Sequence, residues 1–318
     1  MDARVLSIQS HVVHGFAGNR SAIFPLQVLG FDVDFINTVQ FSNHTAYPVF
    51  KGDRLSTDQL KELYSALAEN SIDNYSYVLT GFCFSADLLK EILEIVRHQK
   101  KKNPKLLYFC DPVLGDNGKF YVPEELVPAF KEALEVADFL TPNQFELQQL
   151  SGLPVTDEPS ALAAIDTLMR SHANLKFVCL TSTDFGDANG ILHGLAVARG
   201  SGEGSVQRLR YQMPRLAESF VGTGDLFTAL LLAWNHKLPD NPKLVLERVI
   251  STVYTVLLAT VDYIKVRRNC GSCGSGGPQP SGCQQQQSPW AVRELRLVQS
   301  RSAIERPPPP PTSWVQLI

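Results

Sequence analysis

The sequence predicts an α/β protein in three layers, with a central, mostly parallel sheet between two layers of helices. Short apolar runs alternate with amphipathic helical patterns along the chain. Most of these runs are continuously apolar, which is typical of parallel strands buried on both faces. The chain has 318 residues, 44% of them hydrophobic and 19% charged, so it can bury a sizeable core.

Six short runs are predicted to be strands of this sheet. They are residues 5–8, 33–39, 78–80, 106–110, 139–141 and 177–181. Between them, apolar residues recur three and four positions apart, as on one face of a helix. Such sets are Leu60, Leu63, Tyr64 and Leu67; Leu88, Leu89, Ile92, Leu93 and Val96; and Leu162, Ile165, Leu168 and Met169. Residues 186–194 and 195–210 have the pattern of a β-hairpin.

The charge and the apolar stretches argue against nucleic-acid binding, membrane binding and secretion. The net charge is −3, from 29 basic and 32 acidic residues, so we expect neither nucleic-acid nor membrane-surface binding. No basic and apolar leader precedes the first predicted strand, so we expect no secretory signal. Residues 249–261 are interrupted by serine and threonine, and we expect them to be too short and too polar to cross a bilayer.

We therefore expect a cytoplasmic protein. Cys83, Cys110 and Cys179 lie in or beside apolar runs and are expected to be buried free thiols.

The composition divides the chain into four parts. Residues 1–269 are predicted to form the main α/β domain. Residues 270–289 are rich in Cys, Gly and Gln, lack apolar periodicity and are predicted to be a disordered linker. Residues 290–306 regain an ordered pattern and are predicted to pack on the main domain, and 307–318 are predicted to be a Pro-rich tail.

Two minor motifs lie in these last parts. Cys270, Cys273 and Cys283 could suggest a zinc or redox site, but a tetrahedral site needs a fourth ligand and no histidine lies nearby. Residues 307–311 are a run of prolines, which suits a stiff tail or, alternatively, a ligand for an SH3-like module.

The most informative segment is residues 220–227, Phe-Val-Gly-Thr-Gly-Asp-Leu-Phe, which precedes a long apolar stretch. Gly222 and Gly224 permit a tight turn, and the apolar stretch is predicted to be a helix. The unpaired N–H groups and dipole of a helix start form an anion site, most often for phosphate. Asp225, at the edge of this site, is suited to take a proton from a hydroxyl that attacks phosphorus. The alternative is an ordinary glycine turn before a helix that begins with an aspartate.

Polar residues follow most of the predicted strands. Ligands of parallel α/β sheets bind at the carboxyl ends of the strands, so we expect these residues along one rim. They are Ser10, His11, Thr80, Gly81, Asp111, Thr141, Asn143, Glu146, Thr181 and Ser182. Each alone could equally be a cap or turn residue.

The motifs carry a family resemblance. Residues 220–225 resemble the anion-hole signature of the ribokinase-like superfamily. Further segments resemble the pyridoxal kinase family, in its animal form. They are residues 7–11 with Gly15, 18–20, 24–31, 39–45, 110–116, 141–146 and 295–300.

The resemblance implies a ribokinase-like fold, a homodimer and ATP-dependent phosphorylation of the 5′-hydroxyl of pyridoxal, pyridoxine or pyridoxamine. It implies that Asp225 is the base and that Gly222, Thr223 and Gly224 form the anion hole and contact ATP. The implied vitamer-binding residues are Ser10, His44, Thr45, Phe82, Tyr121, Val221 and Asp225. The implied residues for the nucleotide phosphates are Asp111, Asn143, Thr181 and Ser182. The implied residues for Mg²⁺ (or Zn²⁺) and a monovalent cation (K⁺ or Na⁺) are Asp111, Asp116, Thr141 and Glu146.

Two alternatives remain open at this point. A hydroxymethylpyrimidine kinase would use similar anion-hole chemistry, although Ser10 and residues 43–45 argue against it. A protein that binds the vitamer without turnover is the other, although Asp225, Asp111 and Glu146 argue against it. The expected partners are small molecules, the B6 vitamers and ATP.

Overall fold

The computed structural model describes residues 3–185, 189–200, 202, 205–270 and 289–318. The strands are β1 (Arg4–Val12), β2 (Asp32–Phe41), β3 (Gly52–Arg54), β4 (Tyr77–Thr80), β5 (Leu107–Cys110), β6 (Gly115–Asp116), β7 (Lys119–Phe120), β8 (Phe139–Leu140), β9 (Phe177–Leu180), β10 (Ile191–Arg199), β11 (Val206–Pro214) and β12 (Val315–Leu317). The α-helices are α1 (Asn19–Val28), α2 (Thr57–Glu69), α3 (Ala86–Lys102), α4 (Leu126–Ala133), α5 (Gln144–Ser151), α6 (Glu158–Ser171), α7 (Thr223–Lys237), α8 (Pro242–Cys270) and α9 (Arg301–Glu305). Two 3-10 turns, η2 (Ala291–Arg293) and η3 (Val298–Ser300), precede α9.

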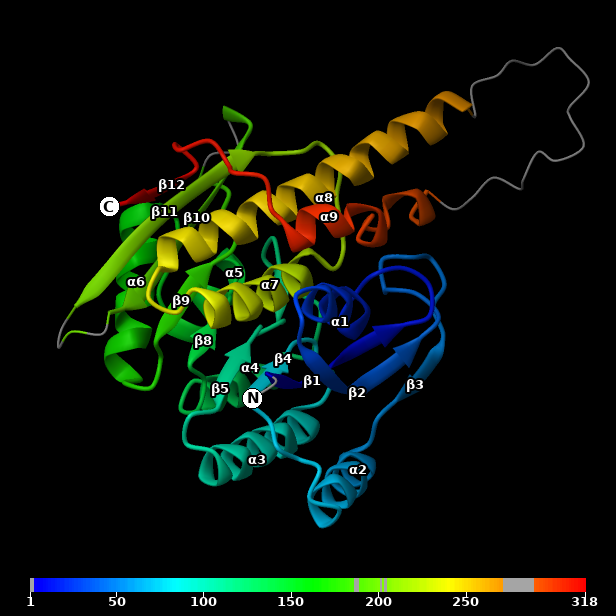
Figure 1. Cartoon of the computed structure of the whole chain (residues 1–318), viewed down its shortest axis with the longest axis vertical. Coiled ribbons are helices and arrows are strands. Elements are labelled where there is room, and N and C mark those ends of the chain that lie inside the picture. Colours follow the sequence, from blue (N-terminus) through cyan, green and yellow to red (C-terminus); the bar gives the residue numbers. More distant parts are fainter. Residues whose placement is uncertain (1–2, 186–188, 201, 203–204, 271–288) are drawn as a thin grey trace, which may run out of the picture.

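Within these residues, one sheet organises the molecule, in the order β12-β11-β10-β9-β8-β5-β4-β1-β2-β3 (Figure 1). The six central strands, which are neighbours in the order β2, β1, β4, β5, β8 and β9, pair in parallel. All four residues of β4 and of β9 are buried, as expected for strands covered on both faces. The predicted mostly parallel sheet is therefore confirmed.

Antiparallel pairs complete both edges of the sheet. β3 pairs with β2 at one edge, and β10, β11 and β12 extend the sheet beyond β9 at the other. β10 and β11 form a hairpin, with Ile191 opposite Pro214 and Arg199 opposite Val206. The predicted bounds, 186–194 and 195–210, were wrong, because Gly194 and Leu195 both lie inside β10. β6 and β7 form a separate two-stranded ribbon.

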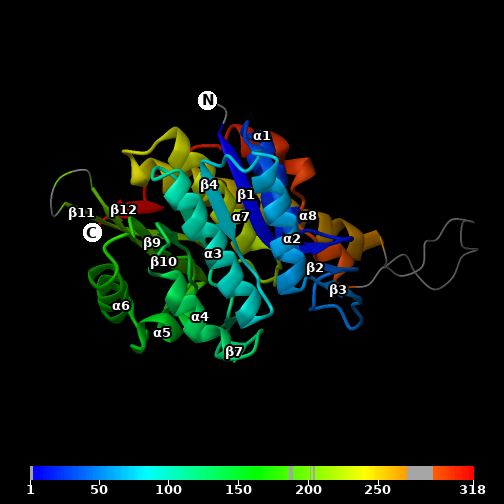
Figure 2. The same cartoon turned by 90° about the horizontal axis from the view of Figure 1, so that it is seen from below.

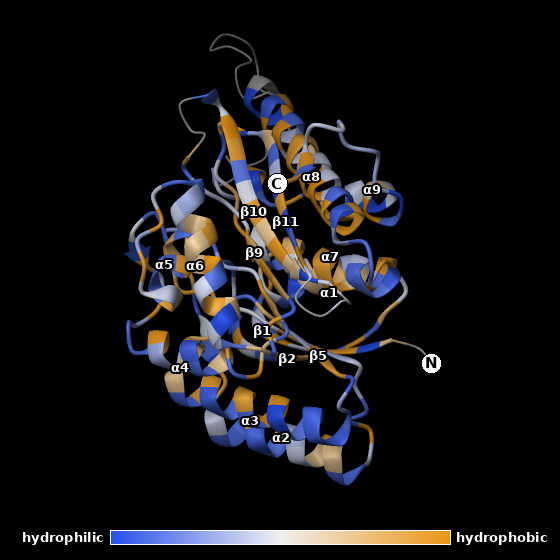
Figure 3. Ribbon diagram, turned by 90° about the vertical axis from the view of Figure 1, so that its left-hand side faces the viewer, coloured by the Kyte–Doolittle hydropathy of each residue, from blue (hydrophilic) through white to orange (hydrophobic). Residues whose placement is uncertain are grey.

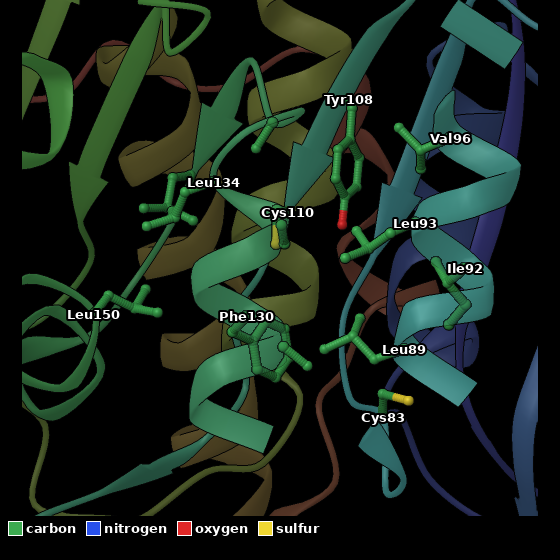
Figure 4. Close-up of a cluster of buried hydrophobic side chains, with 14 of the residues drawn as sticks. Cys83, Leu89, Ile92, Leu93, Val96, Tyr108, Cys110, Phe130, Leu134 and Leu150 are labelled. Atoms are coloured by element: carbon green, nitrogen blue, oxygen red, sulfur yellow. The ribbon is translucent and has the colours of Figure 1, made fainter. Parts of the chain in front are cut away.

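Helices cover both faces of the sheet, as Figures 2 and 3 show. One apolar core joins one face of the sheet to α2, α3, α4, α5 and α6. In Figure 4, side chains of α3 and α4 meet beside β5, which carries Tyr108 and Cys110. A second core joins the other face to α1, α7, α8 and α9. The three layers predicted from the sequence are present.

The end of the first strand and the buried face of α2 differ from the prediction. The first strand continues to Val12, so Ser10 and His11 lie within β1 rather than after it. The ladder to β2 continues past the apolar run, with Val12 opposite Phe41. In α2, Leu60 and Tyr64 are buried as expected, but the side chain of Leu63 is 49% exposed.

Helix α8 corrects the expectation for residues 249–261. The helix Pro242–Arg268 is long and apolar enough to cross a membrane by length and composition, so the argument from shortness was wrong. In the structure, 56% of its apolar window is buried, against α7, β11, β12 and the C-terminal turns. Such burial is what a core helix of a folded domain shows.

The last 30 residues pack on the main domain. Residues 289–306 lie along α8 and over α1 (Figure 1). The carbonyl of Pro307 accepts a hydrogen bond from Nη1 of Arg248 at 3.0 Å, and that of Pro308 accepts one from the hydroxyl of Ser251. β12 then pairs with β11, with Leu317 opposite Leu209. The expected tail is therefore partly a strand of the sheet, which three residues of β-pattern were too short to indicate.

Three of the cysteines can be compared with the prediction. Cys83, Cys110 and Cys179 are free and buried, as predicted. The possible zinc or redox site lies outside the described residues, since it depends on Cys273 and Cys283. The domain boundaries around residues 270–289 stay a prediction.

Candidate active site

The start of α7 is built as an anion site. Gly222 precedes the helix with φ 85° and ψ 5°, a left-handed conformation that favours glycine. A Cβ at this position would lie 2.0 Å from the carbonyl oxygen of Phe16. The hydroxyl of Ser21 donates a 2.8 Å hydrogen bond to the carbonyl of Gly222. The turn is thus held against the segment that joins β1 to α1, and the first N–H groups of α7 are left without helical partners.

Asp225 lies in the first turn of α7, as the sequence predicts. Its Oδ2 accepts a 2.7 Å hydrogen bond from the amide of Gly18. Desolvation raises the pKa of Asp225, and the Gly18 hydrogen bond opposes this only in part. The carboxylate is therefore fixed in position and more basic than an ordinary aspartate.

Gly18 also brings Ser10 to this place. A Cβ on Gly18, which has φ +56°, would lie 2.3 Å from the hydroxyl of Ser10 and 2.1 Å from its carbonyl oxygen. The backbone of one glycine is therefore in contact with Ser10 on one side and with Asp225 on another. Ser10 and Asp225 are therefore close together, at the rim of the sheet where the sequence predicts the site.

Asp111 completes the acidic part of the rim. It follows β5 and is buried, and its amide donates to the carbonyl of Thr80 at 3.0 Å. Burial, together with the negative charges of Glu146 and Asp225, raises the pKa of Asp111 well above its usual range. A Cβ on Gly224 would lie 3.2 Å from Oδ2 of Asp111. Asp111 thus lies next to the anion site.

Glu146 is the third carboxylate of the site, and it is buried. It lies in the first turn of α5 and forms a capping box with Asn143. Its Oε1 accepts from the amide of Leu114 at 2.9 Å, and its Oε2 accepts from the amide of Asn143 at 2.8 Å. Burial raises the pKa of Glu146 to about 8 although these amides lower it. Three acids in one another's field favour a bound cation or proton.

The other predicted cation and phosphate residues are partly engaged in the fold. The side chain of Asn143 accepts from the Glu146 amide at 2.9 Å and donates to the Gly115 carbonyl at 2.7 Å. Both Asp116 oxygens accept hydrogen bonds from Asn117, at 2.8 and 3.0 Å. The hydroxyl of Thr141 lies 2.8 Å from that of Thr228. Asn143 thus holds the backbone at Gly115 and Glu146, Asp116 holds its neighbour Asn117, and Thr141 joins the end of β8 to α7 through a pair of hydroxyls.

These acids suit a magnesium ion that the protein would bind together with phosphates and water, rather than one enclosed by side chains alone. Among the described residues, no group of three or more His, Cys, Asp or Glu side chains is arranged to hold a metal by itself. Mg²⁺ commonly binds through one or two carboxylates and completes its shell with phosphates and water. Asp111, with its raised pKa, suits that arrangement.

A cavity of about 550 Å³ opens beside the anion site. Five of the residues predicted from the sequence line it, namely Asp116, Thr181, Ser182, Thr223 and Gly224. One wall is apolar and comes from Phe227 and from Ile250, Val253 and Leu257 of α8. Sequence reasoning missed this wall, although the three α8 residues keep helical spacing. The apolar wall suits an aromatic base, and Thr223 and Gly224 at the start of α7 suit phosphates.

Four of the residues predicted for the vitamer lie in segments next to the anion site or after β2 and β4, namely His44, Thr45, Phe82 and Val221. Phe82 and Val221 pack on one apolar cluster with Val12, Val39 and Phe41. His44 is buried and Thr45 is exposed in the loop after β2.

Tyr121 does not join this group in the described contacts. Its side chain is 59% exposed. The pKa of Tyr121 is raised, first by partial burial and then by the negative charges of Asp116 and Glu146. Tyr121 therefore lies within the field of Asp116 and Glu146, and its role in vitamer binding stays a prediction.

One contact residue was absent from the prediction. Glu294, just before the segment 295–300 used for the resemblance, reaches the loops that carry Phe16 and His44. Nothing in the local pattern indicates this contact, which joins Glu294 to a residue 278 positions away.

The site suits phosphoryl transfer, because an anion bound at the open helix start would lie beside a fixed carboxylate that can accept a proton. On a three-layer sheet of this topology, that chemistry defines a phosphotransferase of the ribokinase-like fold. No protein-family model matches the chain. Pyridoxal kinase of Sus scrofa is 44% identical over 316 residues, which cover 96% of this chain and 93% of the relative.

Two solved structures agree with that similarity. Pyridoxal kinase from Leishmania donovani in complex with ADP and ginkgotoxin superposes with a TM-score of 0.83 and 33% identity, over 100% of both chains. The same enzyme in complex with ADP and pyridoxamine gives a TM-score of 0.81 and 34% identity, over 99% of both chains. The chain belongs to the pyridoxal kinase family.

Proposed function

We propose that this protein transfers the γ-phosphoryl group of ATP to the 5′-hydroxyl of pyridoxal, pyridoxine or pyridoxamine. Family membership supports the reaction, and the position of Asp225 carries the assignment of its chemistry. That carboxylate lies in the first turn of the anion-site helix, hydrogen-bonded to Gly18 and beside Ser10 and Asp111.

In this proposal Asp225 takes the proton of the vitamer hydroxyl as that oxygen attacks phosphorus. Its raised pKa suits a base, because a more basic carboxylate accepts the proton more readily. The amides at Gly222, Thr223 and Gly224 stabilise the charge of the transferring group. Preorganised donors of this kind commonly contribute the largest share of catalysis.

The buried acids would hold the cations. Asp111 and Glu146 would bind Mg²⁺ (or Zn²⁺) together with the nucleotide, with Asp116 and Thr141 beside a monovalent cation, K⁺ or Na⁺. The divalent ion supplies charge neutralisation on the phosphates. The raised pKa of Asp111 and that of Glu146, about 8, are the physical reason to expect cation binding there.

The two substrates would occupy adjacent parts of the site. ATP would lie in the cavity lined by Thr181, Ser182 and the apolar wall of α8. The vitamer would bind between Ser10, the loop of His44 and Thr45, and the cluster of Phe82 and Val221. Both substrates would reach the start of α7, where the vitamer hydroxyl would face the γ-phosphoryl group directly, with the Asp225 carboxylate beside the hydroxyl.

A cytoplasmic homodimer without membrane or nucleic-acid partners is part of the proposal, from the family resemblance and the near-neutral charge. Light scattering after gel filtration measures the assembly directly. A mass of one chain would contradict the dimer.

The reaction itself is tested by ADP release with MgATP and, in turn, pyridoxal, pyridoxine, pyridoxamine and hydroxymethylpyrimidine. Mass spectrometry of the product identifies the phosphorylated hydroxyl. We expect ADP with the B6 vitamers. ADP with hydroxymethylpyrimidine alone would favour the sister kinase, and vitamer binding without ADP would favour the binding protein.

A further inference from the structure

Glu294 joins three segments that are far apart in the sequence. Its Oε2 accepts a 2.9 Å hydrogen bond from the amide of Phe16, in the segment between β1 and α1. Its Oε1 accepts a 2.9 Å hydrogen bond from the hydroxyl of Tyr47 and lies 3.3 Å from Nε2 of His44, both in the loop after β2. One carboxylate therefore holds two loops of the vitamer side together.

The carboxylate is buried and charged. The side chain of Glu294 is only 10% exposed. Burial alone would raise the pKa of Glu294, but the hydrogen bonds from His44, Phe16 and Tyr47 lower it overall. A buried ion with three hydrogen-bond partners fixes their positions, because moving any of them away leaves a buried charge unsatisfied.

The backbone at Gly15 is shaped for this contact. Gly15 has φ +91°, and a Cβ there would lie 2.1 Å from Oε2 of Glu294. A side chain would both strain the backbone and displace the carboxylate. Gly15 and Glu294 thus form a close contact between an N-terminal and a C-terminal segment of the chain.

His44 is left with one nitrogen available. Its ring is buried, with centroids 4.7 Å from Tyr47 and 6.0 Å from Trp290. With Nε2 facing Glu294, Nδ1 is buried and has no hydrogen-bond partner in the described structure. The ring nitrogen that does not face Glu294 is thus left to hydrogen-bond another group. Buried polar atoms normally have a partner, so a ligand group can supply it.

We propose that Glu294 is a positioning residue for the vitamer: it holds the loops of Phe16 and His44 in the arrangement that binds the pyridine ring, and it orients the His44 ring so that Nδ1 is left for a hydrogen bond to the ligand. This inference rests on the proposed function for the identity of the ligand. Glu294 contacts no reacting atom, and its effect passes through the two loops.

The experiment compares Glu294→Gln with the wild type in the full-length chain. The substitution keeps the size of the side chain but removes the charge and turns one oxygen into a donor. We expect the dissociation constant of pyridoxal, measured by calorimetry, to rise about tenfold or more, the effect of losing a charge-assisted hydrogen bond. The dissociation constant of a non-hydrolysable ATP analogue should stay within about twofold, since Glu294 does not line the nucleotide cavity.

Two further variants separate positioning from folding. Tyr47→Phe removes one hydrogen bond to Glu294 and keeps the ring, so it should weaken pyridoxal binding in the same direction but less. Added to Glu294→Gln it should contribute little more, because the two changes break one network. Glu305→Gln, an exposed glutamate of α9, is the matched control and should change neither constant.

The outcomes distinguish this inference from the proposed function. Unchanged pyridoxal affinity in Glu294→Gln, or an equal loss for pyridoxal and the ATP analogue with a lower melting temperature, would overturn the inference. If the wild type binds pyridoxal without forming ADP, the kinase assignment fails while the binding comparison still decides the role of Glu294. A wild-type protein that binds no vitamer overturns both.

Discussion

The amide of Gly18 donates a 2.7 Å hydrogen bond to Oδ2 of Asp225, which joins the segment after β1 to the first turn of α7. These residues are 207 positions apart. Gly18 also packs against Ser10. Ser10, proposed to bind the vitamer, and Asp225, proposed to take the proton of its hydroxyl, therefore contact the same backbone segment. Binding and proton removal are thereby set by the same piece of chain.

The turn before α7 should tolerate no side chain at position 222. Gly222→Ala combines a left-handed backbone with a Cβ 2.0 Å from the Phe16 carbonyl oxygen. Gly30→Ala is the matched control, since Gly30 has φ +92° but no atom within 4 Å of an added Cβ. We expect Gly30→Ala to cost about 1–2 kcal/mol of unfolding free energy, from backbone strain alone. Gly222→Ala should cost more and also lower turnover.

Urea denaturation of both variants measures these costs. Equal costs, with normal turnover in Gly222→Ala, would show that the turn does not depend on its close approach to Phe16.

The stability of the ligand-free protein should fall as the pH rises through the titration of Glu146. The pKa of this glutamate is raised from 4.5 to about 8 in the folded state. Its contribution to stability is fully present below the unfolded pKa and is lost as the pH rises toward the folded one. Between these values the folded state binds the additional proton, so Glu146 contributes a slope of up to about 1.4 kcal/mol per pH unit.

Denaturation midpoints across that pH range test this slope, and Glu146→Gln should flatten it. Glu62→Gln, an exposed glutamate of α2, serves as the control. A wild-type protein that becomes more stable over the same range would contradict the account of the buried acids.

The end of the chain should behave as part of the sheet. Val315 of β12 is 1% exposed, whereas Leu317 of the same strand is 61% exposed. We expect Val315→Ala to cost about 1–2 kcal/mol from lost burial and the remaining cavity. Leu317→Ala should change the free energy of unfolding little. Similar small effects of both substitutions would mean that β12 adds nothing to the fold in solution.

Local patterns explain what the sequence could predict. The turn at Gly222, the acid at Asp225 and the apolar α7 are adjacent in the chain, so their chemistry is visible without the fold. Parallel strands place their ends at one edge, which is why Asp111 and Glu146 could be expected together.

Contacts between distant segments could not be predicted in the same way. Glu294 meets Phe16 only because the C-terminal segment returns across α1, and no periodicity encodes that path. The apolar nucleotide wall depends on how α8 crosses α7. Tyr121 was assigned from the resemblance alone, and its 59% exposed side chain belongs to no apolar cluster that would have indicated a substrate contact.

The central claim is that Asp225 removes the hydroxyl proton, and the single-turnover rate of phosphoryl transfer to pyridoxal tests it most directly. Asp225→Asn should lower this rate by about 10²-fold or more with little change in ATP affinity, because the amide cannot accept the proton. Asp58→Asn, an acid in the first turn of α2, should leave the rate unchanged. A near-normal transfer rate in Asp225→Asn would contradict the account.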